Sequence, residues 1–238
     1  MTGSLLRGRV AVITGSTRGI GRAMAERFAQ EGARVVINGR QAADARAAAA
    51  DIPGSIGVGG DVSELADIEA LVTRVVDEFG RIDILVNNAA ISRRSAVTRV
   101  SDEEWAEVIR VNLTGPMFVT RAVVPVMKRQ GAGVILNVIS GAGTHGTAGF
   151  SSYAASKGGL VGLTLTWAKE LERFAIRVNA LSPSALTDMM RQLPAEMLGP
   201  MEERLADPAD VADVALFLVS DLGKTVRGQI VSAGAGPP

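Results

Sequence analysis

The chain has 238 residues, and its 25 Lys and Arg balance its 25 Asp and Glu. Proteins that bind nucleic acids in general carry a basic excess to meet phosphates, so this balance predicts no nucleic-acid partner. The chain has no Cys, which excludes disulfides, thiolate catalysis and cysteine-ligated zinc.

Short apolar runs alternate with amphipathic segments along the chain. In chain order, these patterns predict strand 9–14, helix 19–31, strand 34–38, helix 41–51, strand 55–62, helix 64–79 and strand 82–87. They continue with helical residues 102–130, interrupted near Gly115 and Pro116, then strand 133–139, helix 153–174, strand 176–181, a helix from 207 to about 220, and strand 229–232.

This alternation predicts the fold class. Strands that alternate with helices form parallel sheets with helices on both faces, joined by right-handed crossovers. We therefore expect an α/β fold, a doubly wound parallel sheet (Rossmann-type) of about seven strands. No linker or low-complexity break divides residues 1–238, which predicts a single domain. Residues 184–207 are rich in Met, Leu and Pro, and are expected to form a substrate lid.

A glycine-rich turn lies between the first strand and the first helix. Gly15, Gly19 and Gly21 have the spacing G-x-x-x-G-x-G, which differs from the common G-x-G-x-x-G. Glycines let the backbone approach a pyrophosphate, and the following helix start supplies free N–H groups. The turn predicts a dinucleotide site; the alternative is a plain strand-to-helix turn.

The end of the second strand bears on which dinucleotide binds. NAD sites usually place an acid there, whereas NADP sites use Arg to meet the added phosphate. The segment Asn38-Gly39-Arg40 has no acid, and Arg18 lies inside the glycine turn. Two guanidinium groups can clamp one phosphate, which favours NADP(H) over NAD(H). The alternative is that both are ordinary solvated arginines.

Tyr153, the only Tyr in the chain, precedes Lys157 by four positions. Residues at this spacing share a helix face, and a nearby ammonium is expected to lower the pKa of the phenol. Tyr153 then becomes an acid toward a carbonyl oxygen, or a base toward an alcohol. Ser140, at the end of a strand, can hold the same oxygen. The alternative is an exposed pair on a solvated helix.

These residues together resemble a known family. The matching positions are Thr14-Gly15-x-x-x-Gly19-Ile20-Gly21, Asp61-Val62, Asn87-Asn88-Ala89, Asn112, Ser140, Tyr153-x-x-x-Lys157, and Asn179 before Pro183. In this order and spacing the chain resembles the classical short-chain dehydrogenases/reductases along essentially its whole length. The likeness is closest to β-ketoacyl-carrier-protein reductases, through the Ser-Thr-Arg-Gly-Ile-Gly loop and Tyr-Ala-Ala-Ser-Lys.

The resemblance implies roles for individual positions. The implied catalytic set is Asn112, Ser140, Tyr153 and Lys157, with Asn112 supporting a water chain that feeds protons to the last two. The implied cofactor contacts are Gly15, Thr17, Arg18, Gly19, Ile20, Gly21, Arg40, Asp61, Val62, Asn88, Ala89, Ala90, Tyr153, Lys157 and Thr187. Asp61 and Val62 would frame the adenine. For Asn112, an amide that bonds only backbone remains the alternative.

The chain departs from the family pattern at several positions. Ala90 and Ser184 stand where the family usually has Gly. Thr187, the match for the hydroxyl that holds the nicotinamide carboxamide, comes one residue early. The segment 233–236, Ala-Gly-Ala-Gly, replaces the usual Asp-Gly-Gly. These changes leave the catalytic set intact and concern the nicotinamide-side loop, the substrate and the subunit interface.

The expected function is that of an oxidoreductase, a ketoreductase that transfers a hydride between NADP(H) and a ketone or secondary alcohol. The expected substrates include 3-oxoacyl groups attached to a carrier protein. A basic surface on this chain would help such a carrier protein to dock. The candidates for that surface are Arg93, Arg94, Arg99, Arg121, Lys128 and Arg129, and the alternative is that they form an ordinary solvated face. The alternatives are a non-catalytic NADP(H)-binding sensor or scaffold protein and, less favoured, a dehydratase or isomerase.

The remaining expectations concern assembly and location. Helices 102–130 and 153–174 resemble those by which the family forms homodimers and homotetramers. The sequence contains no run of about twenty apolar residues that would predict a membrane span, and residues 1–9 do not have the pattern of a secretory signal. His145 is the single His, and no side chains cluster as metal ligands in the sequence. We therefore expect a cytoplasmic protein with no metal site.

Overall fold

The computed structural model describes residues 4–185, 199 and 205–234. Seven parallel strands form a sheet in the order β3-β2-β1-β4-β5-β6-β7. The strands are β1 (Val10–Ile13), β2 (Arg34–Gly39), β3 (Ile56–Gly59), β4 (Ile84–Asn87), β5 (Gly133–Val138), β6 (Ile176–Pro183) and β7 (Ile230–Ala233). The predicted doubly wound parallel sheet is confirmed.

Helices connect these strands. They are α1 (Gly19–Gln30), α2 (Ala42–Ala50), α3 (Leu65–Phe79), α4 (Asp102–Ile109), α5 (Gly115–Gln130), α6 (Ala142–His145), α7 (Ser151–Glu170) and α10 (Pro208–Val219). Short 3-10 turns are η1 (Val97–Arg99), η3 (Glu172–Phe174) and η4 (Asp221–Gly223), and η2 (Arg110–Thr114) is a π-helical turn.

Local chemistry explains several helix boundaries. Ser101 caps α4 by accepting a hydrogen bond from the Glu104 N–H at 3.1 Å. Asp207 caps α10 in the same way, followed by Pro208 in the first turn. Gly80 and Gly131 end α3 and α5 with φ of 73° and 69°, a left-handed conformation that glycine adopts without a steric penalty.

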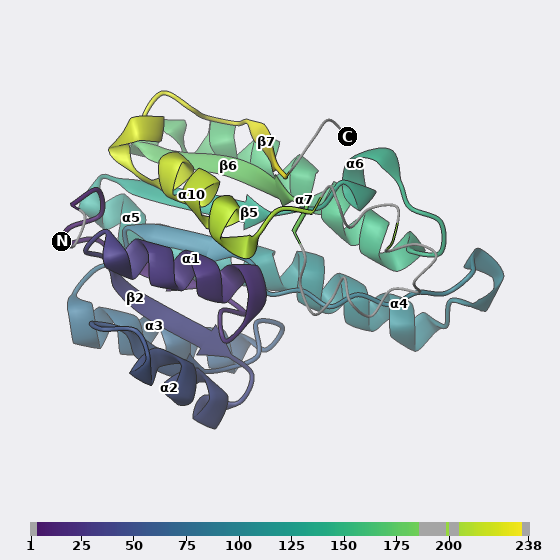
Figure 1. Ribbon diagram of the computed structural model, residues 1–238, viewed down its shortest axis with the longest axis horizontal. Coiled ribbons are helices and arrows are strands. Elements are labelled where there is room, and N and C mark those ends of the chain that lie inside the picture. The colour runs from purple at the N-terminus through teal and green to yellow at the C-terminus, as the bar shows by residue number, and fades with distance from the viewer. Residues whose placement is uncertain (1–3, 186–198, 200–204, 235–238) are drawn as a thin grey trace.

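Two apolar layers cover the sheet. On one face, Met24 and Phe28 of α1 pack with Val211 and Leu218 of α10. On the other face, residues of α3, α5 and α7 form a second core that includes Trp167. Figure 1 shows α1 and α10 side by side in front of the sheet, with the α4, α6 and α7 end extending past the strands. Because both faces are covered, the central strands are continuous runs of buried residues.

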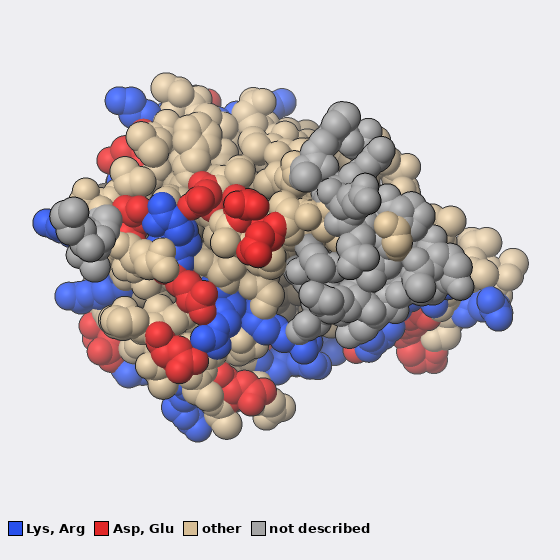
Figure 2. All heavy atoms as spheres, viewed as in Figure 1, with Lys and Arg blue, Asp and Glu red and all other residues tan. Residues whose placement is uncertain are grey.

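Ion pairs join the helices of the first face. Arg22 of α1 bonds Asp51 at 2.9 Å, and Arg27 bonds Asp213 of α10 at 2.6 Å. Figure 2 shows basic and acidic side chains interleaved over this part of the surface. Exposed pairs of this kind contribute little to stability, about 0–1 kcal/mol each, so the apolar layers carry the fold.

A buried polar ladder crosses the other face of the sheet. The Asn87 amide on β4 donates to Thr120 on α5 at 3.1 Å and to Asn137 on β5 at 2.8 Å. Asn137 in turn donates to Thr164 on α7 at 2.8 Å. All four side chains are nearly inaccessible to solvent. The ladder ties α7 to the two strands on which the site below depends.

Several predicted boundaries differ from the structure. The interruption predicted near Gly115 is the π-helical turn η2, which ends one residue earlier. The helix predicted from residue 153 begins at Ser151, and it ends at Glu170, before the 3-10 turn η3. The sequence pattern does not predict α6 or η1, because four-residue and three-residue helices are too short to show a helical period.

Within residues 4–185, 199 and 205–234, no helix combines the length and the apolar character needed to cross a bilayer. The same residues contain no group of three or more His, Cys, Asp or Glu side chains placed to hold a metal ion. Thr187, and residues 186–198 and 200–204 of the predicted lid, lie outside the described residues.

Candidate active site

The site lies at the carboxyl ends of β1, β4 and β5. From β1 the chain first builds the sheet outward through β2 and β3, and it then returns to place β4 on the other side of β1. At such a reversal of strand order the connecting loops diverge and leave a crevice, where ligands of doubly wound sheets bind.

The glycine turn packs tightly against the end of β4. Gly15 has φ of 62°, and a Cβ there would lie 2.7 Å from Ala89 Cα. The Asn88 amide donates to the Thr14 and Gly15 carbonyls at 2.9 and 3.0 Å. The Thr14 hydroxyl accepts the N–H groups of Asn88 and Ala89. The side chain of Asn88 therefore holds the glycine turn in place.

The start of α1 is open by comparison. Gly19 has φ of 59°, and a Cβ there would meet no atom within 4 Å. Arg18, the N-cap residue, makes no side-chain hydrogen bond to the helix start. Thr17 and Ile20 are partly buried beside it, and Gly21 is buried. A helix start without a cap leaves backbone N–H groups free for an anion, so this turn fits a pyrophosphate.

The end of β2 carries positive charge. A Cβ on Gly39 would lie 2.6 Å from Thr17 Cγ2, so the strand end lies against the glycine turn. The Asn38 amide is fully used, since it donates to the carbonyls of Val58 and Gly60. Arg18 and Arg40 are exposed, and neither forms an ion pair with a described carboxylate. Both guanidinium groups are available to a phosphate.

Asp61 and Val62 follow β3. Val62 is buried, and a Cβ added to Gly115 of α5 would lie 3.0 Å from its Cγ2. Asp61 Oδ1 accepts hydrogen bonds from the Ser63 N–H at 2.9 Å and from the Ser63 hydroxyl at 2.6 Å. Burial raises the pKa of Asp61, but the bonds from Ser63 and the charges of Arg110 and Arg40 outweigh it and lower the pKa below its usual value.

Ser140, Tyr153 and Lys157 meet beside this crevice. Ser140 follows β5 by two residues, and its hydroxyl accepts the Ala142 N–H at 3.2 Å. Tyr153 and Lys157 lie one turn apart on α7, and the Lys157 Nζ is 5.8 Å from the centre of the Tyr153 ring. That Nζ donates to the Val138 carbonyl at 2.7 Å. The alternative of an exposed Tyr–Lys pair is excluded for Lys157, which is 2% exposed.

The pKa of Tyr153 moves in the direction opposite to the prediction. Burial raises the pKa of the phenol, and hydrogen bonding with Ser140 opposes this by a smaller amount. Burial also lowers the pKa of Lys157 to about 8. The expected net lowering of the tyrosine pKa is therefore not found, because burial of the phenol outweighs the groups that favour the phenolate. The phenol is neutral at pH 7 and is suited to donate a proton.

Asn112 is buried at the middle of η2. Its side-chain oxygen accepts the Ile91 N–H at 2.8 Å, while its amide donates to the Ile91 carbonyl at 2.8 Å and to Ser156 Oγ at 3.2 Å. Ser156 Oγ donates to the Tyr153 carbonyl at 2.7 Å. The amide of Asn112 thus bonds chiefly to backbone, as in the alternative interpretation, and it also reaches the backbone of the helix that carries Tyr153.

Three contacts of the site were not predicted from the sequence. Gly143 on α6 lies against α7, where a Cβ would be 2.8 Å from the Cβ of Lys157. Ser156 bridges Asn112 and Tyr153, and the Val138 carbonyl accepts the bond from Lys157. Ser156 had one signal, its place between Tyr153 and Lys157, but Gly143 and Val138 are brought in only by packing.

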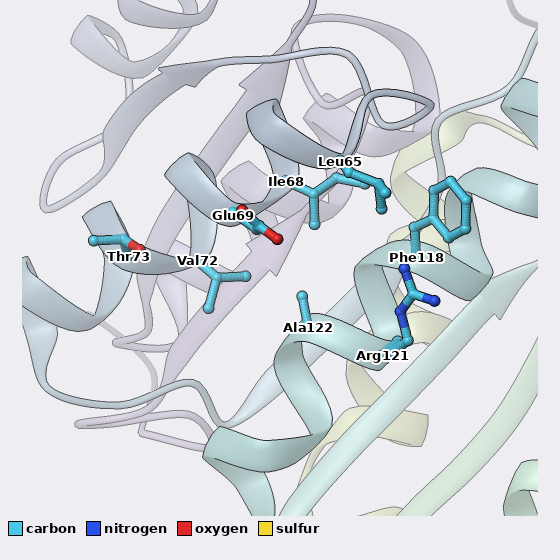
Figure 3. A pocket seen from close by; sticks show the side chains of 8 residues that line it. All are labelled: Leu65, Ile68, Glu69, Val72, Thr73, Phe118, Arg121 and Ala122. Carbon is cyan, nitrogen blue, oxygen red and sulfur yellow. The ribbon is translucent and has the colours of Figure 1, made fainter.

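A surface groove lies elsewhere, between α3 and α5 (Figure 3). Its lining residues are Leu65, Ile68, Glu69, Val72, Thr73, Phe118, Arg121 and Ala122. In Figure 3 the Arg121 guanidinium lies beside the Phe118 ring, 4.9 Å from its centre. None of these residues belongs to the glycine turn or to the group around Tyr153, so the groove is separate from the crevice.

The chain is similar to known proteins over most of its length. The family model described as short chain dehydrogenase matches residues 9–198. The 3-oxoacyl-[acyl-carrier-protein] reductase FabG of Thermotoga maritima is 41% identical over 241 residues, which cover 97% of this chain and 98% of that protein. The protein of the same name from Aquifex aeolicus is 38% identical, with the same coverage of both chains.

A solved structure agrees with these matches. The 3-ketoacyl-(acyl-carrier-protein) reductase from Brucella melitensis, complexed with NADH, has a TM-score of 0.92 and is 36% identical. The similarity covers 97% of this chain and 98% of that one.

Proposed function

The chain belongs to the short chain dehydrogenase family, and on that premise we propose that it reduces the ketone of a 3-oxoacyl thioester with NADPH. It is an oxidoreductase that transfers a hydride between a nicotinamide cofactor and a ketone or secondary alcohol. One observation carries the assignment of the site: the buried Lys157 ammonium and the Tyr153 phenol lie together beside Ser140 at the carboxyl end of β5.

In this proposal, residues at the carboxyl ends of the strands would hold the cofactor. Its pyrophosphate is bound by the glycine turn, chiefly the backbone from Thr17 to Gly21, with Gly15 allowing close approach. Asp61, Val62 and the backbone of 88–90 line the adenosine side. Lys157 would bind the nicotinamide ribose, and Thr187 would bind the carboxamide. When bound, the cofactor supplies a hydride to the carbonyl carbon of the substrate.

The chain's own side chains handle the substrate oxygen and the proton. The hydroxyls of Ser140 and Tyr153 hold the carbonyl oxygen, which becomes more negative as the carbon accepts the hydride. The raised pKa of Tyr153 keeps its proton in place until that charge develops, and the phenol then donates it to the oxygen. Lys157, protonated below its pKa of about 8, favours the phenolate that this leaves. Asn112 positions α7 through Ser156.

Preference for NADPH rests on charge at the end of β2. A 2′-phosphate needs cations, and Arg18 and Arg40 are exposed with no described carboxylate partner. The end of β2 has Gly39 and Arg40 where NAD-binding proteins usually have an Asp or Glu that binds the ribose hydroxyls. The Brucella melitensis relative was solved with NADH. The proposal therefore includes binding of NADH to this chain, with lower affinity than NADPH.

The substrate is proposed to arrive on an acyl-carrier protein, as the names of the relatives state for them. The proposed docking residues are exposed cations: Arg93, Arg94, Arg99, Arg121, Lys128 and Arg129. Arg93 forms an ion pair with Glu107 at 3.2 Å. The Lys128 ammonium lies 4.2 Å from the centre of the Phe174 ring and forms no ion pair with a described carboxylate, so its charge is available to a partner. Charge reversal at Lys128 should raise KM for the carrier-linked substrate and leave KM for a small soluble thioester unchanged.

Four further expectations stay part of the proposal. Residues 1–238 form a single dinucleotide-binding and catalytic domain, and residues 184–207 cover the substrate. The protein is a homodimer or homotetramer, and it is cytoplasmic. Exposed apolar residues in the two segments expected at the subunit contact, 102–130 and 153–174, support the assembly: Trp105 on α4, Met117 on α5 and Leu165 on α7.

The test of the proposed function removes one hydroxyl. Tyr153→Phe should lower the rate of NADPH-dependent ketone reduction by about 10²- to 10⁴-fold, because the general acid is lost. Its Kd for NADPH, measured by titration calorimetry, should change little. Thr166→Ala removes an exposed hydroxyl from the same helix and is the control. Wild-type reduction rates in Tyr153→Phe would refute the assignment.

A further inference from the structure

Arg110 connects two parts of the crevice that lie far apart in the sequence. It is the first residue of the π-helical turn that holds Asn112. Its Nη1 donates to Ser63 Oγ at 2.8 Å and to Glu64 Oε1 at 2.6 Å. Ser63, which is buried, follows Asp61 by two residues in the loop after β3. A single guanidinium nitrogen thus joins η2 to the adenosine side of the crevice.

The Ser63 hydroxyl has its direction set by this contact. Arg110 can only donate, so Ser63 Oγ must accept from it and is left with one proton to give. That proton goes to Asp61 Oδ1, 2.6 Å away. Arg110, Ser63 and Asp61 therefore form a chain in which every donor points the same way. Charge-assisted hydrogen bonds at both ends make such a chain stronger than its neutral counterpart.

The chain leaves one carboxylate oxygen free in a set orientation. Oδ1 of Asp61 accepts both hydrogen bonds from Ser63, whereas Oδ2 accepts none from the described residues. The Asp61 N–H is held as well, by Asp67 Oδ2 at 2.8 Å. The backbone and one oxygen are therefore fixed, and the second oxygen is an acceptor with no competing donor among the residues described.

We propose that Arg110, acting through Ser63, is a positioning residue that holds the free oxygen of Asp61 ready to accept a hydrogen bond from the amino group of adenine. This inference rests on the proposed function, which places the adenine beside Asp61 and Val62. Arg110 does not touch the cofactor in this account; it makes Asp61 selective for a base that presents a donor.

A simpler reading treats Arg110 as half of a surface ion pair with Glu64. The side chains of Arg110 and Glu64 are 48% and 59% exposed, so that pair contributes little by itself. The bond to Ser63 differs, because its acceptor is buried and is already bonded to Asp61. Substitution of each partner separates the two readings.

The experiment measures equilibrium binding, not turnover. Kd values are determined by calorimetry for NADPH and for its analogue with hypoxanthine in place of adenine, which has a carbonyl oxygen instead of the amino group. Wild type should bind NADPH at least about tenfold more tightly, as expected for a hydrogen bond to a charged acceptor. Arg110→Met and Ser63→Ala should each reduce this ratio about three- to tenfold, and the double variant should reduce it no further.

Two controls test the simpler readings. Glu64→Gln removes the exposed ion pair but keeps the Arg110–Ser63 bond, and it should keep the wild-type ratio. Arg74→Met removes an exposed arginine that is paired with Glu78 on α3, and it should keep the ratio as well. Arg110→Lys, which can still donate to Ser63, should restore part of the discrimination.

Each outcome bears on one claim. If wild type binds neither dinucleotide, the proposed function itself fails. If wild type binds both but does not discriminate, or if Arg110→Met discriminates as wild type does, the inference about Arg110 is overturned while the proposed function stands. If Glu64→Gln loses the discrimination to the same extent, the surface ion pair accounts for the effect and the inference is likewise overturned. Thermal melts of each variant verify folding, and Ser63→Ala tests the same chain should Arg110→Met fail to fold.

Discussion

At the scale of single residues, Lys157 shows a conflict between stability and function. Its ammonium group is 2% exposed and has a hydrogen bond to the Val138 carbonyl but no carboxylate partner among the described residues. Burial lowers its pKa from 10.5 to about 8. A buried charge with a single hydrogen bond is costly, and in the proposed mechanism this cost is retained because the ammonium favours the Tyr153 phenolate.

This conflict predicts that Lys157→Met folds more stably than wild type while losing activity. A pKa lowered from 10.5 to about 8 corresponds to about 3 kcal/mol, an upper bound for the gain at pH 7. The penalty is complete below pH 8, where the native and unfolded states are both protonated. It shrinks as the pH rises from 8 to 10.5, because the native state then gives up its proton first. The stability advantage of Lys157→Met over wild type should therefore also shrink over this pH range.

Urea unfolding at pH 7 and at pH 9.5 measures this difference. Lys169→Met, on the exposed side of the same helix, is the matched control and should change stability little at either pH. A gain that grows with pH would contradict the prediction.

Two glycines differ in what they require. Gly15 has φ of 62° and lies against Ala89, whereas Gly162 lies within α7, where an added Cβ would meet no atom within 4 Å. Gly15→Ala should lower the free energy of unfolding by about 1–3 kcal/mol and weaken dinucleotide binding. Gly162→Ala should raise it by about 0.5–1 kcal/mol. Chemical denaturation of both variants measures the contrast, and equal effects would show that the glycine turn is not constrained.

At the scale of elements, the polar ladder explains how α7 is held against the strands. Asn137 lies three residues before Ser140, and Thr164 lies seven residues after Lys157. The hydrogen bond between them is 2.8 Å long and buried. The ladder therefore helps to set the position of the Tyr153 helix relative to the strand end that carries Ser140.

Removal of the middle of the ladder should affect both stability and chemistry. Asn137→Ala leaves a cavity and removes the shared partner of Asn87 and Thr164, at a cost of about 2–3 kcal/mol in a urea titration. We expect kcat to fall more than the affinity for NADPH, because the glycine turn is anchored by Asn88 instead. A fall in affinity with unchanged kcat would contradict this role.

At the scale of the whole molecule, the exposed apolar side chains predict an assembly. Leu165 is 41% exposed on α7. Leu165→Arg should shift the protein toward smaller species in light scattering, because a charge would be buried at the proposed contact. Val97→Arg, at a 78% exposed position in η1, is the control. An unchanged mass for Leu165→Arg would place the contact elsewhere.

Much of the architecture followed from local pattern. The alternation of strands and helices predicted the parallel sheet, because buried strands and amphipathic helices have different periods. The spacing of Tyr153 and Lys157 placed them on one helix face, and the glycine turn was located by its position after the first strand. Elements of three or four residues, η1 and α6, were missed because they are too short for a period to appear.

The sequence by itself determined the fold class, the order of the elements and the placement of Tyr153 and Lys157 on one helix face, since each follows from local periodicity and spacing. Only the tertiary structure decided the direction of the Tyr153 pKa and the partners of Asn112 and Arg110. Those properties depend on burial and on hydrogen bonds between segments 21 to 47 residues apart, as from Asn112 to Ile91 and from Arg110 to Ser63. Desolvation and long-range hydrogen bonding exist only once the chain has packed, which is why spacing alone could not predict them.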